Sequence, residues 1–299
     1  YGENPHQTGA RYRDVTSASA ASGWWETSVQ HGGKAMSYLN VYDTEAAWRL
    51  VHQFEEPTAV VIKHANPCGV ASAHTIDEAY RRAHNCDPVS AFGGIVAVNR
   101  PVTQTMAESL APVFTEVVIA PGYEEGALEV LTAKANLRVL SAERPVGRHF
   151  DLRPIDGGML VQTADDVPVD VEHWSVVTDA KPTDEQWDDI MFAWQVCAAV
   201  SSNAIVYAKD RQAFGIGAGQ QNRLDSSRIA AERSAGRAEG GVCASDAFFP
   251  FRDGLDAAVA AGIRAVVQPG GSVRDDEVIA AANQAGIAMV FTGRRHFRH

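Results

Sequence analysis

A lysine and a histidine stand side by side directly after an apolar run that is typical of a buried strand, residues 59–62. Neighbouring residues on a strand face opposite ways, so Lys63 and His64 share a pocket only if the strand ends there. Asn66 and Gly69 favour such a turn. A fixed cation beside an imidazole suits proton transfer next to an oxyanion. On these residues alone, a surface lysine and a hydrogen-bonded loop histidine is the simpler interpretation.

Three aromatic residues crowd into four positions of the segment 245–253, SDAFFPFRD. Aromatic side chains on a regular element usually belong to the core. Pro250 and the polar flanks argue against one continuous buried element here. Phe248, Phe249 and Phe251 are therefore candidates for the walls of a slot that takes a flat heterocycle.

The chain ends in RRHFRH, residues 294–299, which concentrates three arginines and two histidines. A basic tail in solvent is the simplest interpretation. The tail directly follows an apolar strand pattern, however, and this favours docking against the fold. Arginine is well shaped for bidentate capture of phosphate or carboxylate.

Two motifs that suggest cofactors do not match on inspection. Residues 215–220, GIGAGQ, lack the third glycine of a dinucleotide-binding loop and follow a hairpin pattern, so no NAD site is expected. Pro67-Cys68 resembles the start of a deaminase zinc motif, but Ala71 stands where the second thiolate belongs. We therefore expect no zinc.

Composition excludes several classes of protein. The 299 residues carry 26 basic and 37 acidic side chains, a net charge of -11, which disfavours nucleic acid and anionic membranes as partners. No apolar run approaches the roughly 18 residues of a membrane helix. The four cysteines are too sparse for a disulfide scaffold and favour a reduced, cytoplasmic protein. The sequence begins at Tyr1 without a methionine or a leader, which suggests a piece of a longer chain.

Strand-like and helix-like segments alternate along the chain, which predicts an α/β fold. Helices are expected at 77–84, 103–110, 124–134, 183–200, 251–261 and 275–285, with another ending near 228. Strands are expected at 59–62, 91–98, 117–119, 137–140, 159–161, 204–208, 213–218, 265–267 and 287–291. A polar stretch, 142–182, reads as the crossover between two α/β units of similar size, 1–150 and 151–299. No repeat of individual residues is apparent.

Taken together, the motifs resemble one family. The segments YGENPHQ, KHANPCGVA, SAFGG, SNAIVYAK, GIGAGQ, SDAFFPFRDG, QPGGS and RHFRH occur in the order found in the transformylase portion of the bifunctional AICAR transformylase/IMP cyclohydrolase family of purine biosynthesis. AICAR is 5-aminoimidazole-4-carboxamide ribotide. The resemblance spans essentially the whole chain, and it outweighs the simpler interpretation of Lys63 and His64.

The resemblance implies transfer of a formyl group from 10-formyltetrahydrofolate, the cosubstrate, to the 5-amino group of AICAR. By the same resemblance, His64 moves the amine proton, Lys63 supplies positive charge and Asn203 orients the formyl group or the carboxamide. The implied AICAR contacts are Tyr1, His6, Asn40, Arg295, Phe297 and His299. The implied folate contacts are Phe92, Gly93, Glu116, Phe248, Pro250 and Phe251.

The resemblance further implies a duplicated cytidine-deaminase-like α/β/α unit without zinc and a homodimer with active sites between subunits. Relatives bind a structural monovalent cation, K⁺, near the SNA segment and the C-terminus, but Ser201 stands where they often carry a longer residue. The sequence lacks the cyclohydrolase domain that normally precedes the transformylase portion. It also lacks the arginine expected just before Tyr1.

Two other hypotheses remain. The chain is a non-catalytic nucleotide-binding or dimerisation fragment of that enzyme, if the missing arginine or domain is needed for turnover. Alternatively it is a deaminase-like hydrolase, which fold kinship alone suggests and which stoichiometric zinc would support.

Overall fold

The computed structural model describes residues 1–12, 23–147, 150–165 and 169–299. Within them, twelve strands form one sheet that is flanked by helices, which confirms the predicted α/β class. In the first half of the chain the elements are α1 (Trp24–Thr27), β1 (Val29–Gly32), α2 (Tyr38–Val51), β2 (Thr58–Lys63), β3 (Asn66–Ser72), α3 (Ile76–His84), β4 (Gly94–Val98), α4 (Gln104–Leu110), β5 (Thr115–Ala120), α5 (Glu125–Thr132) and β6 (Arg138–Ser141).

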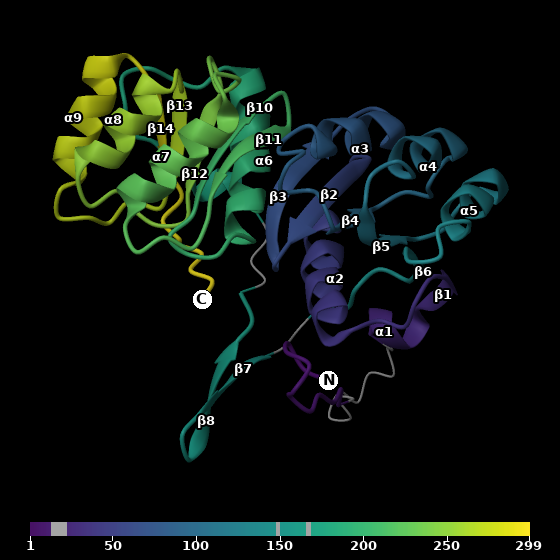
Figure 1. Cartoon of the computed structure of the whole chain (residues 1–299). Coiled ribbons are helices and arrows are strands. Elements are labelled where there is room, and N and C mark those ends of the chain that lie inside the picture. The colour runs from purple at the N-terminus through teal and green to yellow at the C-terminus, as the bar shows by residue number, and fades with distance from the viewer. Residues whose placement is uncertain (13–22, 148–149, 166–168) are drawn as a thin grey trace.

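A separate two-stranded hairpin, β7 (Phe150–Ile155) and β8 (Gly158–Thr163), connects the halves and extends away from the rest of the molecule (Figure 1). The second half then comprises the 3₁₀ helix η1 (Val171–His173), β9 (Ser175–Val176), α6 (Asp184–Ala198), β10 (Ile205–Lys209), β11 (Gln212–Gly217), α7 (Arg223–Ser234), β12 (Val242–Ser245), α8 (Arg252–Ala260), β13 (Ala265–Gln268), α9 (Asp275–Ala285) and β14 (Ala288–Phe291).

The sheet has the same strand order on both sides of its centre. Outward from the antiparallel pair β3–β11, one side runs β3-β2-β4-β5-β6-β1 and the other β11-β10-β12-β13-β14-β9. On each side a hairpin is followed by three parallel strands and an antiparallel edge strand. Because β3 and β11 are antiparallel, the parallel strands of the two halves point in opposite directions.

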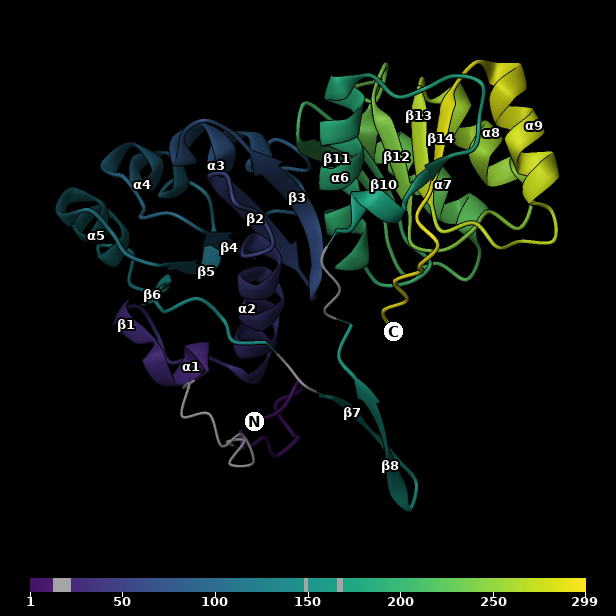
Figure 2. The same ribbon diagram turned by 180° about the vertical axis from the view of Figure 1, so that it is seen from behind.

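Helices cover both faces of the sheet (Figure 2). On one face, α2 and α6 pack on a single core cluster shared by both halves, with the rings of Phe54 and Phe192 5.3 Å apart. On the other face, α3–α5 cover the first half and α7–α9 the second, each over its own cluster. The burial of apolar side chains in these three clusters is what stabilises the two layers of helices against the sheet.

The hairpin turns repeat at the level of single residues. Lys63 ends β2 and Lys209 ends β10, and both residues of each following turn have positive φ, 52° and 58° in one and 52° and 54° in the other. In each turn the second residue donates its N–H to a helix carboxylate, Asp43 of α2 at 2.8 Å or Asp189 of α6 at 2.7 Å. The two lysines and the two aspartates are separated by the same number of residues.

The same spacing relates other structural residues. Trp48 and Trp194 are buried at equivalent places in α2 and α6. Capping boxes start both helices, with Ser37 and Thr183 as the N-caps. The sequence analysis missed this repeat because only a few structurally important residues recur, and the residues between them differ in the two halves.

Several elements differ from the sequence-based prediction. The residues after Lys63 were expected to form a loop, but the turn needs only two residues and Asn66–Ser72 is a strand. Helix α2 and strand β12 were not predicted. The apolar residues of α2 face a sheet on one side only and are mixed with polar ones. The stretch 142–182 contains a full hairpin where only residues 159–161 were expected as strand. Within the described residues, no helix is long and apolar enough to cross a membrane.

Substitution of Gly69 tests the close packing of α3 on β3. A Cβ atom at this position would lie 2.0 Å from the carbonyl oxygen of Ala83, which is backbone and cannot move alone. We expect Gly69→Ala to lower the free energy of unfolding by about 3 kcal/mol or more in urea denaturation. Gly122→Ala is the matched control, since its Cβ would meet no atom within 4 Å. Equal stability of the two variants would contradict this account.

Candidate functional site

The Lys63–His64 turn presents an anchored amine beside an open imidazole. Lys63 Nζ donates hydrogen bonds to the carbonyl oxygens of Phe92 at 3.1 Å and Gly93 at 3.0 Å. Gly93 has φ +68°, and a Cβ there would lie 3.2 Å from Nζ, so the close approach of the amine requires glycine. His64 is exposed in the left-handed region of backbone conformation, with φ 52°. The turn thereby fixes the amine and leaves the imidazole accessible.

Asp43 supports this turn and was missed by the sequence analysis. Its carboxylate accepts the N–H of Ala65 at 2.8 Å, which holds the turn in its left-handed conformation. Burial raises the pKa of Asp43, while the Ala65 hydrogen bond and the charge of His64 act in the opposite direction. Recognising α2 as a helix would have been the signal, because Asp43 follows its capping box by one turn.

Asn40, expected to contact AICAR, is the third residue of α2 and part of that capping box. Its side-chain oxygen accepts the Ser37 N–H at 3.1 Å, and its own N–H donates to Ser37 Oγ at 3.1 Å. Only 8% of Asn40 is exposed. The side-chain amide NH₂ is the part of Asn40 that remains for a ligand, one helical turn from Asp43.

The C-terminal tail docks against the fold. The Arg298 guanidinium donates to the carbonyl oxygen of Ala65 at 3.0 Å and to that of Ala199. Ser202 N–H donates to the Arg298 carbonyl at 2.8 Å, and Ser201 N–H donates to Asn66 Oδ1 at 2.8 Å. The turn, the SNA segment and the tail therefore meet at one edge of the sheet, as the sequence analysis expected of a docked tail.

A cavity of about 310 Å³ lies at this edge, between the SNA segment and the tail. Asn203, Gln220, Phe297 and His299 are among its lining residues. The Arg295 guanidinium lies 4.5 Å from the centroid of the Phe297 ring, and the rings of Phe297 and His299 are 5.5 Å apart. A guanidinium and an aromatic face beside a polar cavity suit a flat heterocycle that carries an anionic group.

The Asn203 amide is held at both ends. Its oxygen accepts from Arg223 Nη2 at 2.7 Å, and its nitrogen donates to the Gln220 carbonyl at 2.8 Å. Arg223 in turn forms an ion pair with Asp246, and their side chains are 6% and 0% exposed. Arg223 and Asp246, which the sequence analysis left without a role, thus fix the orientation of Asn203.

The expected folate residues fall into two groups. Phe92 is exposed and stacks on Phe114 with ring centroids 5.0 Å apart, next to Gly93 and to Glu116, whose carboxylate pairs with Arg138. The second group, Phe248, Pro250 and Phe251, follows β12. Phe251 is exposed beneath the Arg274 guanidinium. Strands β2, β3, β11 and β10 lie between the two groups.

One member of the aromatic run does not belong to a ligand slot. Phe249 is fully buried in the third core cluster, and its N–H donates to Gln268 Oε1 at 2.9 Å. The slot suggested from three rings therefore has only Phe248 and Phe251 available, because the Phe249 ring packs into the core.

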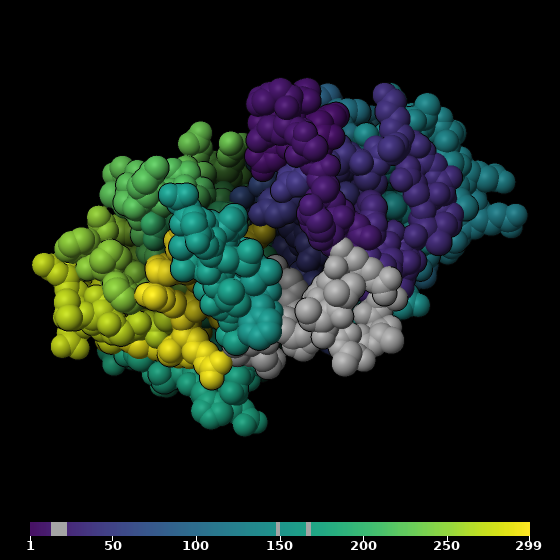
Figure 3. Space-filling view, turned by 90° about the horizontal axis from the view of Figure 1, so that it is seen from below, coloured from purple at the N-terminus to yellow at the C-terminus, as the bar shows by residue number. Residues whose placement is uncertain are grey.

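Tyr1 and His6 are exposed in a local loop, in which Gly2 N–H donates to the Gln7 carbonyl. Within the described residues, no hydrogen bond joins Tyr1 or His6 to Lys63 or the tail. Figure 3 shows the N-terminal segment apart from the C-terminal tail, while the β7–β8 hairpin lies against that tail. Arg153 of the hairpin donates to the His299 carbonyl at 2.7 Å. One chain does not bring the N-terminal residues to the other expected AICAR contacts.

The corner between the SNA segment and the tail, where K⁺ was expected, contains several oxygen atoms that already accept hydrogen bonds. The Ser201 carbonyl accepts from Gly219 N–H, and the Asp246 carboxylate accepts from Arg223 and Ser202. The Arg298 guanidinium also lies at this corner, on the carbonyl oxygens of Ala65 and Ala199. Among the residues that the structure describes, no cluster of three or more His, Cys, Asp or Glu side chains is arranged to hold a metal ion.

Comparison with known proteins gives one consistent result. Residues 1–233 match the family model described as "AICARFT/IMPCHase bienzyme". The whole chain is similar to proteins named "Bifunctional purine biosynthesis protein PurH": 54% identical to that of Xylella fastidiosa, 52% to that of Xanthomonas campestris pv. campestris and 51% to that of Cereibacter sphaeroides. The chain spans 57%, 57% and 59% of the lengths of these relatives.

Removal of one partner tests the buried Arg223–Asp246 pair. Arg223→Met leaves the Asp246 carboxylate buried without its counter-charge, so we expect the free energy of unfolding to fall by about 3–5 kcal/mol. Adding Asp246→Asn removes the uncompensated charge and should recover part of that loss. Urea denaturation of both variants measures this. A loss below about 1 kcal/mol in Arg223→Met would mean that the pair does not hold this corner.

Proposed function

The chain belongs to the AICARFT/IMPCHase bienzyme family, and we propose that it transfers a formyl group from 10-formyltetrahydrofolate to the 5-amino group of AICAR. The observation that carries the proposal is the Lys63–His64 turn. Its ammonium group is anchored on two carbonyls next to an accessible imidazole.

The chemistry needs a base and a stabilised oxyanion, because the amine of AICAR is conjugated with the carboxamide and is a weak nucleophile. The amine nitrogen bonds to the formyl carbon, and its proton passes to His64. The bond from that carbon to N10 of the folate then breaks, and N10 takes the proton as tetrahydrofolate leaves. Lys63 has three N–H donors and uses two on backbone carbonyls, so the third is available for the oxyanion.

The AICAR ribotide is assigned to the tail cavity. Arg295 meets the phosphate, the Phe297 ring stacks on the imidazole, and His299 lines the same cavity. Asn203 orients the formyl group or the carboxamide, with its amide held by Arg223 and Gln220. Tyr1, His6 and Asn40 complete the proposed AICAR contacts. The folate contacts are Phe92, Gly93, Glu116, Phe248, Pro250 and Phe251.

A homodimer with active sites between subunits accounts for the separation of these residues. Three strand spacings separate Lys63 on β2 from the residue that starts β10, about 14 Å. Lys63 Nζ is bonded on the β4 side, and the Asn203 amide is bonded to Gln220 and Arg223. The side chains of Lys63 and Asn203 in one chain therefore lie at different places. We assign Lys63 and His64 of one subunit to the same site as Asn203 of the other.

The β7–β8 hairpin supplies a surface for such a dimer. Its exposed apolar side chains contact little of their own chain, with exposures from 51% at Ile155 to 60% at Phe150 and Val161. Apolar side chains on an extended arm are typical of a subunit interface. The hairpin touches the tail through Arg153 and His299, so a partner that packs on it would border the proposed AICAR cavity.

We assign the two halves, 1–150 and 151–299, to a duplicated cytidine-deaminase-like unit that has no zinc. The mirrored strand order and the equivalent Lys63 and Lys209 turns support duplication. A structural K⁺ at the corner between the SNA segment and the tail is part of this proposal, since carbonyl and carboxylate oxygens gather there, and no step of the formyl transfer depends on it. The four cysteines are free thiols, which supports a cytoplasmic location.

Turnover with AICAR and 10-formyltetrahydrofolate, followed by the absorbance of tetrahydrofolate, tests the reaction. We expect His64→Ala to lower kcat about 10²- to 10⁴-fold, because it removes the group that takes the amine proton. His74→Ala, a change of another exposed histidine, is the control and should keep the wild-type rate. Undiminished turnover in His64→Ala would reject the assignment. Binding of AICAR without turnover by the wild-type chain would instead favour a non-catalytic fragment.

Mixed dimers test the shared site. His64→Ala and Asn203→Ala should each be nearly inactive alone. When the two variants are mixed and allowed to exchange subunits, half of the dimers combine one of each, and one of their two sites has both native residues. Activity should then return to about a quarter of the wild-type value. A mixture as inactive as its components would contradict the assignment of Lys63, His64 and Asn203 to different subunits.

A further inference from the structure

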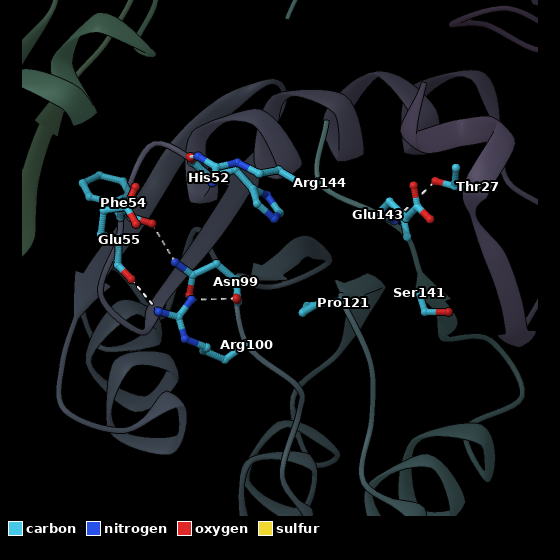
Figure 4. Close-up of a pocket in the computed structure, with 11 residues that line it drawn as sticks. Thr27, His52, Phe54, Glu55, Asn99, Arg100, Pro121, Ser141, Glu143 and Arg144 are labelled. Carbon is cyan, nitrogen blue, oxygen red and sulfur yellow. Dashed lines mark hydrogen bonds between the residues drawn. The ribbon is translucent and has the colours of Figure 1, made fainter. Parts of the chain in front are cut away.

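A second cavity, of about 540 Å³, lies at the opposite edge of the sheet from Lys63. Figure 4 shows its lining residues, which come from the segments that follow β4, β5 and β6 and from the end of α2. In α/β sheets, ligands gather beyond the carboxyl ends of parallel strands, and this cavity has that position in the first half. Nothing in the formyl-transfer proposal uses it.

Two arginines line the cavity without carboxylate partners. Arg100 donates to the carbonyl oxygens of Asn99, at 3.0 Å, and Glu55. Arg144 donates to the carbonyl oxygen of His52 at 2.8 Å. In the described part of the chain, neither guanidinium forms an ion pair, although the chain carries eleven more acidic than basic side chains. These hydrogen bonds to backbone orient both guanidinium groups without a direct bond to a carboxylate, as an anion site requires.

His52 adds a neutral acceptor between the two arginines. Its Nδ1 faces the Trp48 carbonyl oxygen at 2.9 Å, and its ring packs edge-on against Trp48. Burial lowers the pKa of His52, the hydrogen bond to Trp48 acts in the opposite direction, and the charges of Arg144 and Arg100 lower it further, which favours the neutral imidazole. With Nδ1 donating to the carbonyl, Nε2 is left as an acceptor, and the ring points into the cavity (Figure 4). A hydroxyl group is the natural donor to it.

The segment that carries Arg100 begins at a strand end that has an equivalent in the other half. Asn99 follows β4, and its N–H donates to the carbonyl oxygen of Thr58, the first residue of β2. Asp246 follows β12, and its N–H donates to the carbonyl oxygen of Ala204, just before β10. The ends of β4 and β12 thus have the same support, on opposite edges of the sheet.

We propose that this cavity is a second ligand site, for a ribonucleoside monophosphate. Arg100 and Arg144 bind the phosphate, and a ribose hydroxyl donates to His52 Nε2. Phe54, whose ring packs in the core, borders the cavity as well. Glu55 and Glu143 also line the cavity, and their carboxylates oppose an anion without forming hydrogen bonds of their own in the described structure. They limit the affinity of the site.

Calorimetric titration with AMP tests the proposal in the full chain carrying Arg295→Gln, which removes the phosphate contact of the proposed AICAR cavity. AMP should bind, and adenosine, which lacks the phosphate, should not. The added pair Arg100→Gln and Arg144→Gln should raise Kd about ten-fold or more, because two charge-assisted contacts are lost. Arg228→Gln, at an exposed arginine of α7, is the matched control.

Glu143→Gln separates ligand binding from structural damage. The change removes a carboxylate that repels the phosphate, so it should lower the Kd for AMP about two- to three-fold. The side-chain NMR signals of His52, assigned with His52→Gln, should shift on addition of AMP. No binding of AMP, equal binding of adenosine, or a Kd that is unchanged by the two arginine substitutions would overturn the proposal. None of these results bears on turnover, which is measured separately.

Discussion

The antiparallel pairing of β3 with β11 joins the two halves edge to edge, and the positions of both cavities depend on it. Only Val70 and Ala71 of β3 pair with β11, but this continues one sheet through twelve strands. Because the central strands are antiparallel, the parallel strands of the two halves run in opposite directions. The carboxyl ends of β4–β6 and of β12–β14 therefore lie at opposite edges, and each edge has its own polar cavity.

The same pairing places the Lys63–His64 turn beside the SNA segment. The turn lies at the carboxyl end of β2 but at the amino ends of the parallel strands β4 and β5. Its left-handed residues lack the freedom of glycine, and a half-buried carboxylate, Asp43, offsets the cost by accepting a backbone N–H. The equivalent turn after Lys209 is held by Asp189 in the same way. The two halves thus share the same kind of turn, but only the turn after Lys63 carries an imidazole, that of His64.

Several arginines of this acidic protein are held by groups other than carboxylates. The Arg295 guanidinium of the tail lies over the Phe297 ring. Arg100 and Arg144 bond to backbone carbonyls. Hydrogen bonds to carbonyl oxygens orient a cation without neutralising it, which leaves its field for a ligand. The buried Arg223 differs, because it forms an ion pair with Asp246 and donates a hydrogen bond that orients Asn203.

The sequence by itself determined the α/β class, most of the elements after residue 58, the docked tail and the family. Those features follow from local periodicity, from capping residues such as Thr183, and from motifs whose residues are near one another in the chain. Only the tertiary structure decided that Asn66–Ser72 is a strand, that Phe249 turns into the core and that Asp43 supports the Lys63–His64 turn. It also revealed the repeat and the cavity around His52. Each of these depends on contacts between segments far apart in the chain, and such contacts are set by packing, which local sequence patterns do not encode.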